Sequence, residues 1–409
     1  MARFRRLPDP EAAAAPGVIP APLPPMPWAL LAACCFGMFA ASSSGTTRAP
    51  FLIEMARDLD TSLPLVGNLM ALTSVAWGIA SVLAGAWSDR WGRRPFLAGG
   101  PVALALCMLG VAGAGSYVWV AVWATLGGGC SGAFTGVLMA EASARVVDRQ
   151  RGRALGWVMA GQSLTLLVGV PLAAWIGAWV GWRGVHQVVA GIAVLAALSL
   201  VLTTLRPVPV APGPRPPRTG TRAALTGPVL RLLAMGVAER ICYGLIAVYF
   251  ATFLQSTYGL SLAGVAVPLA VFAAGSILGT ILGGQLADRL PDRRLTFAGA
   301  MIGAAGLAVV LFGWTPGLGT SVALGFAYVF VNAIARPSLM AALANVPEEH
   351  RGTVLGLNVT SASIGWLGAA SLGGWMMAGW GFGGFGPLAA GIGLLGAVLA
   401  LTGRQNRGV

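Results

Sequence analysis

The sequence is dominated by twelve long apolar segments separated by short charged or glycine-rich turns. Each is long enough to cross a bilayer, since a helical crossing needs about 20 predominantly apolar residues. The hydrocarbon core offers the backbone no hydrogen-bond partners, so segments of this length cross it as helices. The first six lie near 28–47, 64–87, 96–115, 117–140, 154–179 and 184–205, and the second six near 228–254, 261–286, 295–314, 320–345, 353–377 and 383–402. We therefore predict an all-α membrane protein with twelve transmembrane helices.

The composition agrees with a membrane location and excludes several classes of protein. Hydrophobic residues make up 56% of the 409 residues and charged residues 10%, and the mean hydropathy is +0.78, far outside soluble averages. All 26 basic residues are Arg, so the chain lacks the Lys that a P-loop or a Schiff-base site requires. The Arg residues that give the net charge of +13 lie in the loops and not along one face of a domain. This distribution argues against nucleic-acid binding.

The residues that usually hold metals or perform catalysis are few and scattered. The five cysteines lie within apolar segments and no two have CxxC spacing. His186 and His350 lie far apart in predicted loops, so we expect no metal site. The scattered acids supply no catalytic constellation. We expect neither a cofactor nor an enzymatic activity. A membrane sensor that moves no solute is an alternative that the sequence leaves open.

The two sets of six helices are joined by a stretch that resembles neither. Residues 206–227 are rich in proline and carry four Arg and no acid, a composition typical of a linker. The predicted parts are a cytoplasmic tail at 1–27, a six-helix bundle at 28–205, a cytoplasmic linker at 206–227, a second six-helix bundle at 228–402 and a cytoplasmic tail at 403–409.

The Arg residues gather on one side of this topology. The N-terminus, the loops after the even-numbered helices and the C-terminus together hold 21 of the 26 Arg, whereas the opposite side holds Arg48, Arg57 and Arg183. Cytoplasmic loops carry the excess of basic residues in membrane proteins. Both termini are therefore expected in the cytoplasm, in a multi-pass protein of the inner membrane.

The two halves share loop motifs at a nearly constant offset. The stretch Gly85-Ala-Trp-Ser-Asp89-Arg90-Trp-Gly92-Arg93-Arg94 follows the second predicted helix, and a related stretch with Asp288 and Arg289 follows the eighth. The offset is 199 between the two Asp residues, and Arg151-Gly152 recurs as Arg351-Gly352 at an offset of 200. Such a repeat predicts two pseudo-symmetric six-helix bundles.

Two six-helix halves with G-x-x-x-D-R-x-G-R-R after the second helix closely resemble the major facilitator superfamily, over the whole chain. The resemblance implies a monomeric secondary transporter that moves a small molecule by alternating access. In that family the loop at Asp89 stabilises the outward-facing state. The implied gating motif comprises Gly85, Asp89, Arg90, Gly92, Arg93 and Arg94, with Asp288 and Arg289 in the repeat. The alternative is that these Arg residues only set the topology.

The fifth predicted helix contains Gly161-Gln-Ser-Leu-Thr-Leu-Leu-Val-Gly169-Val-Pro171. This stretch is similar to a relaxed form of the Gly-Pro motif of drug:proton antiporters like the arabinose efflux permease. The similarity implies proton-coupled efflux of a drug, sugar or metabolite, although small residues also serve ordinary helix packing. Many such antiporters carry an Arg near the start of the fourth helix, whereas Trp123–Gly129 here is uncharged.

Three ionisable residues lie deep within predicted helices, Glu239 and Arg240 in the seventh and Arg336 in the tenth. Each such group costs about 2.5–3.5 kcal/mol on insertion scales. At 1.5 Å per residue, Glu239 lies roughly 16 Å and Arg336 roughly 13 Å from the cytoplasmic ends of their helices. In the resembled fold both helices line the cavity, so we expect this pair to form and to couple transport to protons. The alternative is a static salt bridge.

Polar residues near this pair are predicted to line a substrate cavity. Tyr243 lies one turn beyond Glu239, and Asn332 lies one turn before Arg336. The predicted cavity comprises Tyr243, Asn332, Arg240, Ser43, Thr47 and Asn358. Arg240 is expected to point away from Glu239, because adjacent residues on a helix diverge by about 100°. A proton-coupled importer of a small anion, such as an organic acid or a siderophore, would use the same Arg and is the alternative function.

The predicted topology can be tested by cysteine labelling in intact cells. On a background without the native cysteines, a membrane-impermeant maleimide should label Pro316→Cys but not Arg218→Cys, because only the first lies in a loop outside the cytoplasm. The reverse pattern would overturn the topology.

Overall fold

The structure, a computed structural model, describes residues 26–205, 225–290, 292–315, 317–346 and 348–402. The predicted C-terminal tail lies outside these ranges, as do most of the predicted N-terminal tail and linker. The regular elements of the described chain are helices: α1 (Trp28–Thr46), η2 (Ala49–Phe51), α2 (Leu52–Asp58), α3 (Leu63–Trp91), α4 (Arg94–Gly113), α5 (Tyr117–Ala144), α6 (Asp148–Leu164), η3 (Thr165–Gly169), α7 (Val170–Thr203), α9 (Gly227–Tyr258), α10 (Ala266–Arg289), α11 (Arg293–Gly313), α12 (Leu318–Ala344), α13 (Glu348–Trp380), η4 (Gly381–Gly384) and α14 (Phe385–Leu401).

Ten segments of the described chain are long and apolar enough to cross a membrane, and two of them are unusually long. The segment Gln150–Thr203 has 54 residues and Leu357–Leu401 has 45, or roughly 81 and 68 Å at 1.5 Å per residue. The hydrocarbon core is only about 30 Å thick. Gly181 and Gly381 break these segments with φ of 68° and 59°, a conformation that glycine adopts without strain. We infer that each segment turns back there and crosses twice, which would give twelve crossings.

The turn at Gly181 explains one error in the sequence-based prediction. His186 was expected in a loop, although the predicted segment 184–205 already contains it; it is buried within α7, where Nδ1 lies 2.7 Å from the carbonyl oxygen of Trp182. After the turn, the Trp182 indole donates to Asp58 at 3.0 Å and Arg183 forms an ion pair with the same carboxylate. The chain therefore re-enters a helix at once, and the loop is shorter than its sequence indicates.

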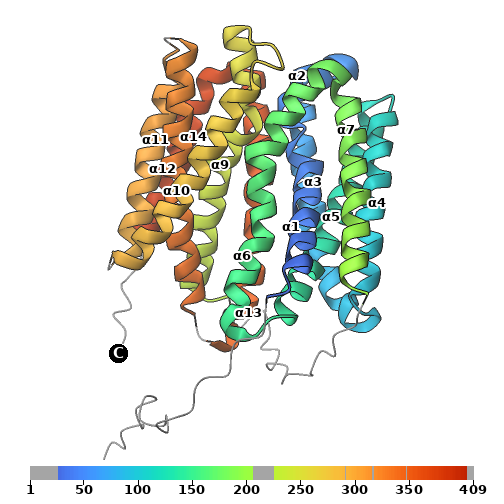
Figure 1. The fold of residues 1–409 in the computed structure, drawn as a ribbon. Coiled ribbons are helices and arrows are strands. Elements are labelled where there is room, and N and C mark those ends of the chain that lie inside the picture. The colour runs from blue at the N-terminus through green and yellow to red at the C-terminus, as the bar shows by residue number, and fades with distance from the viewer. Residues whose placement is uncertain (1–25, 206–224, 291, 316, 347, 403–409) are drawn as a thin grey trace, which may run out of the picture.

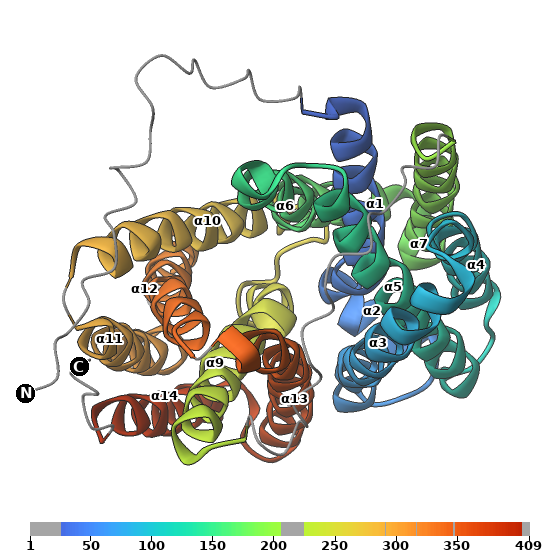
Figure 2. The same cartoon turned by 90° about the horizontal axis from the view of Figure 1, so that it is seen from below.

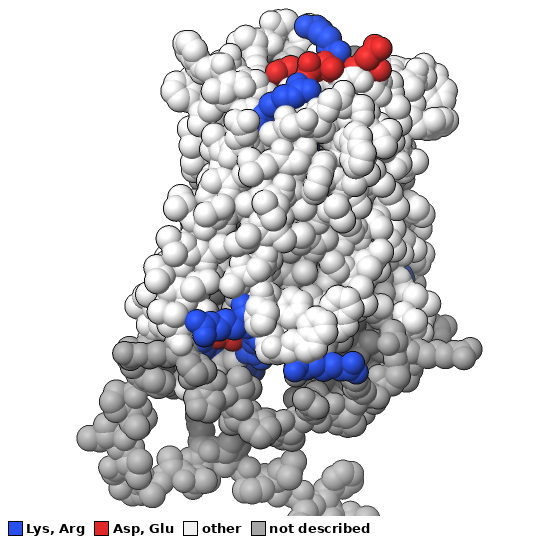
Figure 3. Space-filling model, turned by 90° about the vertical axis from the view of Figure 1, so that its right-hand side faces the viewer, with Lys and Arg blue, Asp and Glu red and all other residues white. Residues whose placement is uncertain are grey.

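The helices form two groups that lie side by side, α1–α7 and α9–α14 (Figures 1 and 2). On the face shown in Figure 3, charged side chains gather near the two ends, with a broad, largely uncharged band between them. This distribution suits a protein whose middle lies in hydrocarbon. Following the predicted topology, we call the end at which α1 begins the inner end and the other the outer end.

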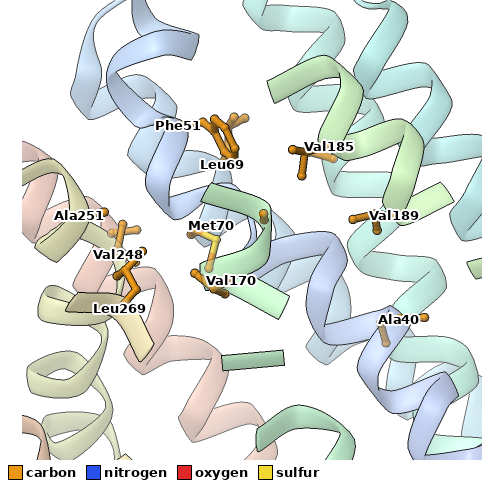
Figure 4. Packing of buried hydrophobic residues seen from close by; sticks show 14 of the residues in the cluster. Ala40, Phe51, Leu69, Met70, Val170, Val185, Val189, Val248, Ala251 and Leu269 are labelled. Carbon is orange, nitrogen blue, oxygen red and sulfur yellow. The ribbon is translucent and has the colours of Figure 1, made fainter. Parts of the chain in front are cut away.

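The two groups are held together by apolar contacts and by close approaches of small residues. Met70 and Val170 lie beside Val248 and Leu269 of the other group in one hydrophobic cluster (Figure 4). Between α3 and α13, a Cβ on Gly374 would lie 3.2 Å from Pro64. Small residues at such a contact let two helices approach closely.

Two further contacts between the groups lie near the outer end. Gln255 at the end of α9 donates to the carbonyl oxygen of Pro50 at 2.9 Å. Gly67, one turn into α3, faces the hydroxyl of Tyr249 at a distance that leaves no room for a Cβ. These contacts close the two groups against each other on the outer side.

Gly67 can be used to test this closure. Gly67→Leu should force Tyr249 away and open the outer side, whereas Gly99→Leu, at a helical position with open space around it, should not. On a background without native cysteines, a maleimide applied from outside should label Gln255→Cys several-fold faster with Gly67→Leu than with Gly99→Leu. Equal rates would contradict the closure.

Candidate functional site

A buried ion pair joins α9 and α12 in the second group. Glu239 is 1% exposed, and its Oε1 accepts hydrogen bonds from Arg336 Nη2 at 3.0 Å and Arg336 Nε at 3.3 Å. The structure thus brings together the two residues whose depths match in the sequence. A buried carboxylate with two charge-assisted hydrogen bonds is strongly held, and removing either partner would leave an uncompensated charge.

Arg240 belongs to the same centre, contrary to the expectation that it points away from Glu239. Its Nε lies 3.8 Å from Glu239 Oε2, although this nitrogen is buried and makes no hydrogen bond within the described chain. The Cβ atoms of adjacent helical residues do diverge, but the long Arg side chain reaches back across the helix surface. The centre therefore holds two cations and one anion.

The ring of Tyr243 lies near both guanidinium groups and packs against further aromatic rings. The Cζ atoms of Arg336 and Arg240 lie 5.0 and 5.9 Å from the ring centre of Tyr243, within cation–π range. Tyr243 packs edge-on against Trp366 at 5.9 Å between ring centres, and Phe272 lies 6.2 Å away. Tyr243 was predicted in the cavity, whereas Trp366 was missed because α13 carries no charge near it.

The accessibility of the three charges differs in a way that matters for a ligand. The side chains of Arg240 and Arg336 are 19% and 26% exposed, but that of Glu239 is only 2% exposed. A solute that reaches this centre therefore meets guanidinium groups first, with the carboxylate behind them. Guanidinium groups pair best with planar anions and hydrogen-bond acceptors.

The other predicted cavity residues have varied surroundings. Asn332 is fully buried, and its Oδ1 has no hydrogen-bond partner in the described chain. The Nδ2 atoms of Asn332 and Asn358 each lie 3.9 Å from a methionine sulfur, Met301 and Met340 respectively. Asn332 therefore places an unpaired amide oxygen inside the second group, and Asn358 lies half-buried on α13.

The two residues predicted on α1 are not joined to this centre by any described hydrogen bond. Thr47 donates to the carbonyl oxygen of Ser43 at 2.7 Å, a common use of hydroxyls inside membrane helices. Ser43 is buried, and its Oγ has no partner in the described chain. Of the two, only Ser43 retains an unused hydroxyl.

The predicted gating motif forms a charged cluster at the inner end of the first group. Gly92, with φ of 81°, ends α3 and turns the chain into α4. Arg93 then lies 3.2 Å from Glu141 on α5, and Arg145 lies 2.6 Å from the other oxygen of the same carboxylate. The sequence analysis missed Glu141, although its position four residues before Arg145 is the signal that indicates a helical ion pair.

The other residues of the predicted gating motif have fewer described contacts than Arg93. Arg90 and Arg94 are exposed, and Gly85 has open space around it. Asp89 lies in the last turn of α3, but its side chain is outside the described part of the structure.

The repeated loop in the second group is built differently. Asp288 and Arg289 are exposed at the end of α10. Asp292 caps α11 by accepting from the backbone N–H of Arg294 at 3.0 Å, and Arg293 donates to the carbonyl oxygen of Ala287 at 3.0 Å. The repeat therefore keeps the sequence pattern but closes its loop with a helix cap.

The stretch Gly161–Pro171, predicted in the fifth transmembrane helix, spans the end of α6, η3 and the start of α7 and changes its helix type there. The backbone N–H of Val170 bonds to the carbonyl oxygen of Thr165, which makes η3 a π-helical turn directly before Pro171. Proline removes one backbone donor, and π turns of this kind often mark functional sites. Gly161 and Gly169 both face α1, where a side chain would meet the backbone of Cys35 and the ring of Phe39.

A second buried cation lies in the first group and was not recognised from the sequence. Arg48 is 1% exposed, donates to the carbonyl oxygen of Ser44 at 3.1 Å and to Thr73 Oγ1 at 3.0 Å, and has no carboxylate partner in the described chain. The sequence placed it in an outer loop because it directly follows an apolar segment. The chain instead continues through η2 and α2, while the Arg48 side chain turns back to its partners Ser44 on α1 and Thr73 on α3.

Comparison with known proteins places the chain in a family. The family model described as Major Facilitator Superfamily matches residues 34–366 and 243–407. The chain is 28% identical to the chloramphenicol resistance protein of Streptomyces lividans over 280 residues, which cover 68% of this chain and 71% of that protein. It is 25% identical to multidrug resistance protein 2 of Bacillus subtilis over 341 residues, covering 80% and 83% of the two chains.

Two further comparisons cover nearly the whole chain. The inner membrane transport protein YdhP of Escherichia coli K12 is 27% identical over 362 residues, covering 86% of this chain and 90% of that protein. The fold matches a crystal structure of a bacterial homolog of the human lysosomal transporter Spinster with a TM-score of 0.73 at 17% identity, over 92% and 94% of the two chains. The chain belongs to the major facilitator superfamily and is a multi-pass membrane transporter, not an enzyme.

The gating motif gives a testable asymmetry between the two loops. Asp89→Asn should shift the balance of conformers more than Asp288→Asn, because only the first loop retains the Gly92 turn and its contact through Arg93 to Glu141. The rate at which Gln255→Cys is labelled from outside, compared at equal expression, would measure the shift. Equal rates for Asp89→Asn and the parent would remove the gating role of Asp89.

Proposed function

We propose that this protein exports a small molecule across the inner membrane in exchange for protons, by alternating access and as a monomer with both termini in the cytoplasm. The direction is supported by the names of relatives, which include a chloramphenicol resistance protein, a multidrug resistance protein and a chloramphenicol efflux pump of Mycobacterium tuberculosis at 26% identity. The substrate class of those proteins suggests chloramphenicol as the first solute to test.

The observation that carries proton coupling is the burial of Glu239 against Arg336. A carboxylate in a low-dielectric interior is stable when a cation lies beside it, and it favours the neutral form when that cation leaves. A rearrangement that draws Arg336 away from Glu239, with Arg240 also displaced from the carboxylate, would therefore favour uptake of a proton, and the return of Arg336 would favour its release. The pair has the properties of a switch between two charge states.

A static bridge between α9 and α12 is the competing explanation. A buried ion pair is weak support for a stabilising role, because its desolvation cost offsets much of the attraction. Arg336 is partly exposed although its partner is almost fully buried, so a solute has access to the cation. Arg240, whose Nε lies 3.8 Å from Glu239 Oε2, is a second cation close to the same carboxylate.

The proposed cycle also needs contacts that open and close at the two ends. At the outer end, Gln255 and Pro50 join the two groups. At the inner end, the ion pair from Arg93 to Glu141 joins the start of α4 to α5 within the first group, and Arg145 at the end of α5 binds the same carboxylate. Of these contacts, the outer one spans the two groups, so it must break when the outer side opens.

Proton-coupled import of a small anion is a second candidate, and the charge of the centre favours it. Two guanidinium groups face the solute and the single carboxylate lies behind them. An anion that binds Arg336 would free Glu239 to take up a proton, so anion and proton would bind together. By linkage, ligands that promote each other's binding favour movement in the same direction, whereas exchange requires mutual exclusion.

The two candidates differ in the proton released or taken up on binding. In weakly buffered solution, purified protein should release protons when it binds the solute of an exchanger and take up protons when it binds the solute of a cotransporter. A dye-based proton count with chloramphenicol and with an aromatic carboxylate such as benzoate would distinguish them.

Replacement of Glu239 tests the coupling itself. Glu239→Gln should abolish solute accumulation driven by a pH gradient in proteoliposomes and keep downhill exchange, because the amide preserves shape but cannot titrate. Glu54→Gln, at a carboxylate near the outer end that accepts from the backbone of Trp182 at 3.4 Å, is the matched control and should still accumulate solute. Gradient-driven accumulation by Glu239→Gln with the pH dependence of the parent would support the static bridge.

A further inference from the structure

An apolar hollow lies between α1 and α6, apart from the buried charges of α9 and α12. It has a volume of about 570 Å³, within the range of pockets that hold small ligands. Its lining includes Trp28, Phe36, Phe39, Trp157, Leu164 and Val168. The hollow begins at the first residue of α1 and extends to the π turn η3, so it runs along the inner half of the membrane-spanning region.

The hollow opens toward lipid. Trp157, Leu164 and Val168 are exposed, and the same exposed stripe continues through Trp175 to Trp179, which is 81% exposed. Large apolar side chains exposed along one face of a membrane helix face the hydrocarbon. In Figure 1 no other helix lies in front of α6. The natural occupant of such a hollow is therefore a hydrocarbon chain.

A cation stands at the inner mouth of the hollow. The Cζ of Arg153 lies 5.5 Å from the ring centre of Trp28, and Trp28 packs edge-on against Trp157 at 5.6 Å. Arg153 is exposed and forms no ion pair or hydrogen bond with the described residues. Stacking on an aromatic face leaves the N–H groups at the edge of a guanidinium free for a phosphate.

The depth of these groups matches that of a phospholipid of the inner leaflet. Trp side chains are enriched at the level of the headgroups, and Arg153 lies one turn before Trp157 on α6. An acyl chain lying along Phe36 and Phe39 would place its headgroup at the Trp residues and its phosphate at Arg153. Basic residues between helices on the cytoplasmic side bind anionic headgroups in this manner.

We propose that the hollow between α1 and α6 is a binding site for an anionic phospholipid of the inner leaflet, with its chain along Phe36 and Phe39 and its phosphate on Arg153. A bound chain would brace α1 against α6 directly beneath the contact in which Thr165 donates to the carbonyl oxygen of Phe39 at 3.1 Å. The lipid would thus support the segment in which the helix changes from α to π geometry.

Native mass spectrometry of the purified full-length protein in detergent can test this site. Dioleoyl phosphatidylglycerol should bind more tightly than dioleoyl phosphatidylcholine by about fivefold, the effect expected of one basic residue near a charged headgroup. Arg153→Gln should lower the affinity for phosphatidylglycerol to that for phosphatidylcholine. Arg231→Gln, which removes a cation from the inner end of α9, is the matched control and should keep the preference.

A second variant tests the place of the chain. Ala32 lines the hollow and is exposed, so Ala32→Trp should fill the space and weaken the binding of both lipids without removing a charge. An undiminished preference for phosphatidylglycerol in Arg153→Gln would overturn the role of Arg153. Unchanged binding of both lipids by Ala32→Trp would overturn the location, and equal binding of both lipids by the parent protein would overturn the selectivity for anionic lipid.

Discussion

The cost of an unpaired charge inside a membrane determines where this chain keeps its ionisable groups. On the face shown in Figure 3, charged side chains gather near the two ends, and Glu239 and Arg48, which are buried inside the described chain, are held by specific partners. Glu239 has Arg336 at 3.0 Å, and Arg48 has the carbonyl oxygen of Ser44 and the hydroxyl of Thr73. An internal charge costs about 2.5–3.5 kcal/mol on insertion scales, so each one that is kept requires a compensating structure around it.

Much of the fold follows from features that the sequence shows directly. Apolar length predicts the helices because lipid enforces backbone hydrogen bonding within each segment. The pairing of Glu239 with Arg336 could be anticipated because depth along a helix is a simple function of residue number. The turn at Gly92, whose φ is 81°, lies within the loop motif Gly85–Arg94 that the sequence singled out, and the second copy of that motif lacks this glycine.

The features that the sequence did not reveal depend on contacts between segments or on side-chain reach. Arg240 approaches Glu239 through a long side chain whose path no helical angle predicts. Arg48 is buried with its side chain turned back to Ser44 on α1 and Thr73 on α3. His186 is helical because Gly181 turns the chain within one residue. Close approaches such as that of Gly161 to the backbone of Cys35 are set by the packing of two helices far apart in the sequence. Glycine is too common in this chain, with 59 residues, for its presence alone to identify them.

The two halves share a repeat, but they do not share their chemistry. Both charges of the central pair lie in the second half, whereas the inner ion pairs around Glu141 lie in the first half. In the proposed cycle, a proton taken up by Glu239 changes the electrostatics between α9 and α12, yet the contacts at the inner end of the first half have no direct bond to that centre in the described structure. The change must therefore pass through the surfaces at which the halves meet, where α3 packs on α13 and Val170 and Met70 lie beside Leu269 and Val248. Close packing of this kind transmits displacement because an interior at crystal-like density cannot absorb it. The apolar contact between the halves is thus as necessary to coupling as the ion pair itself.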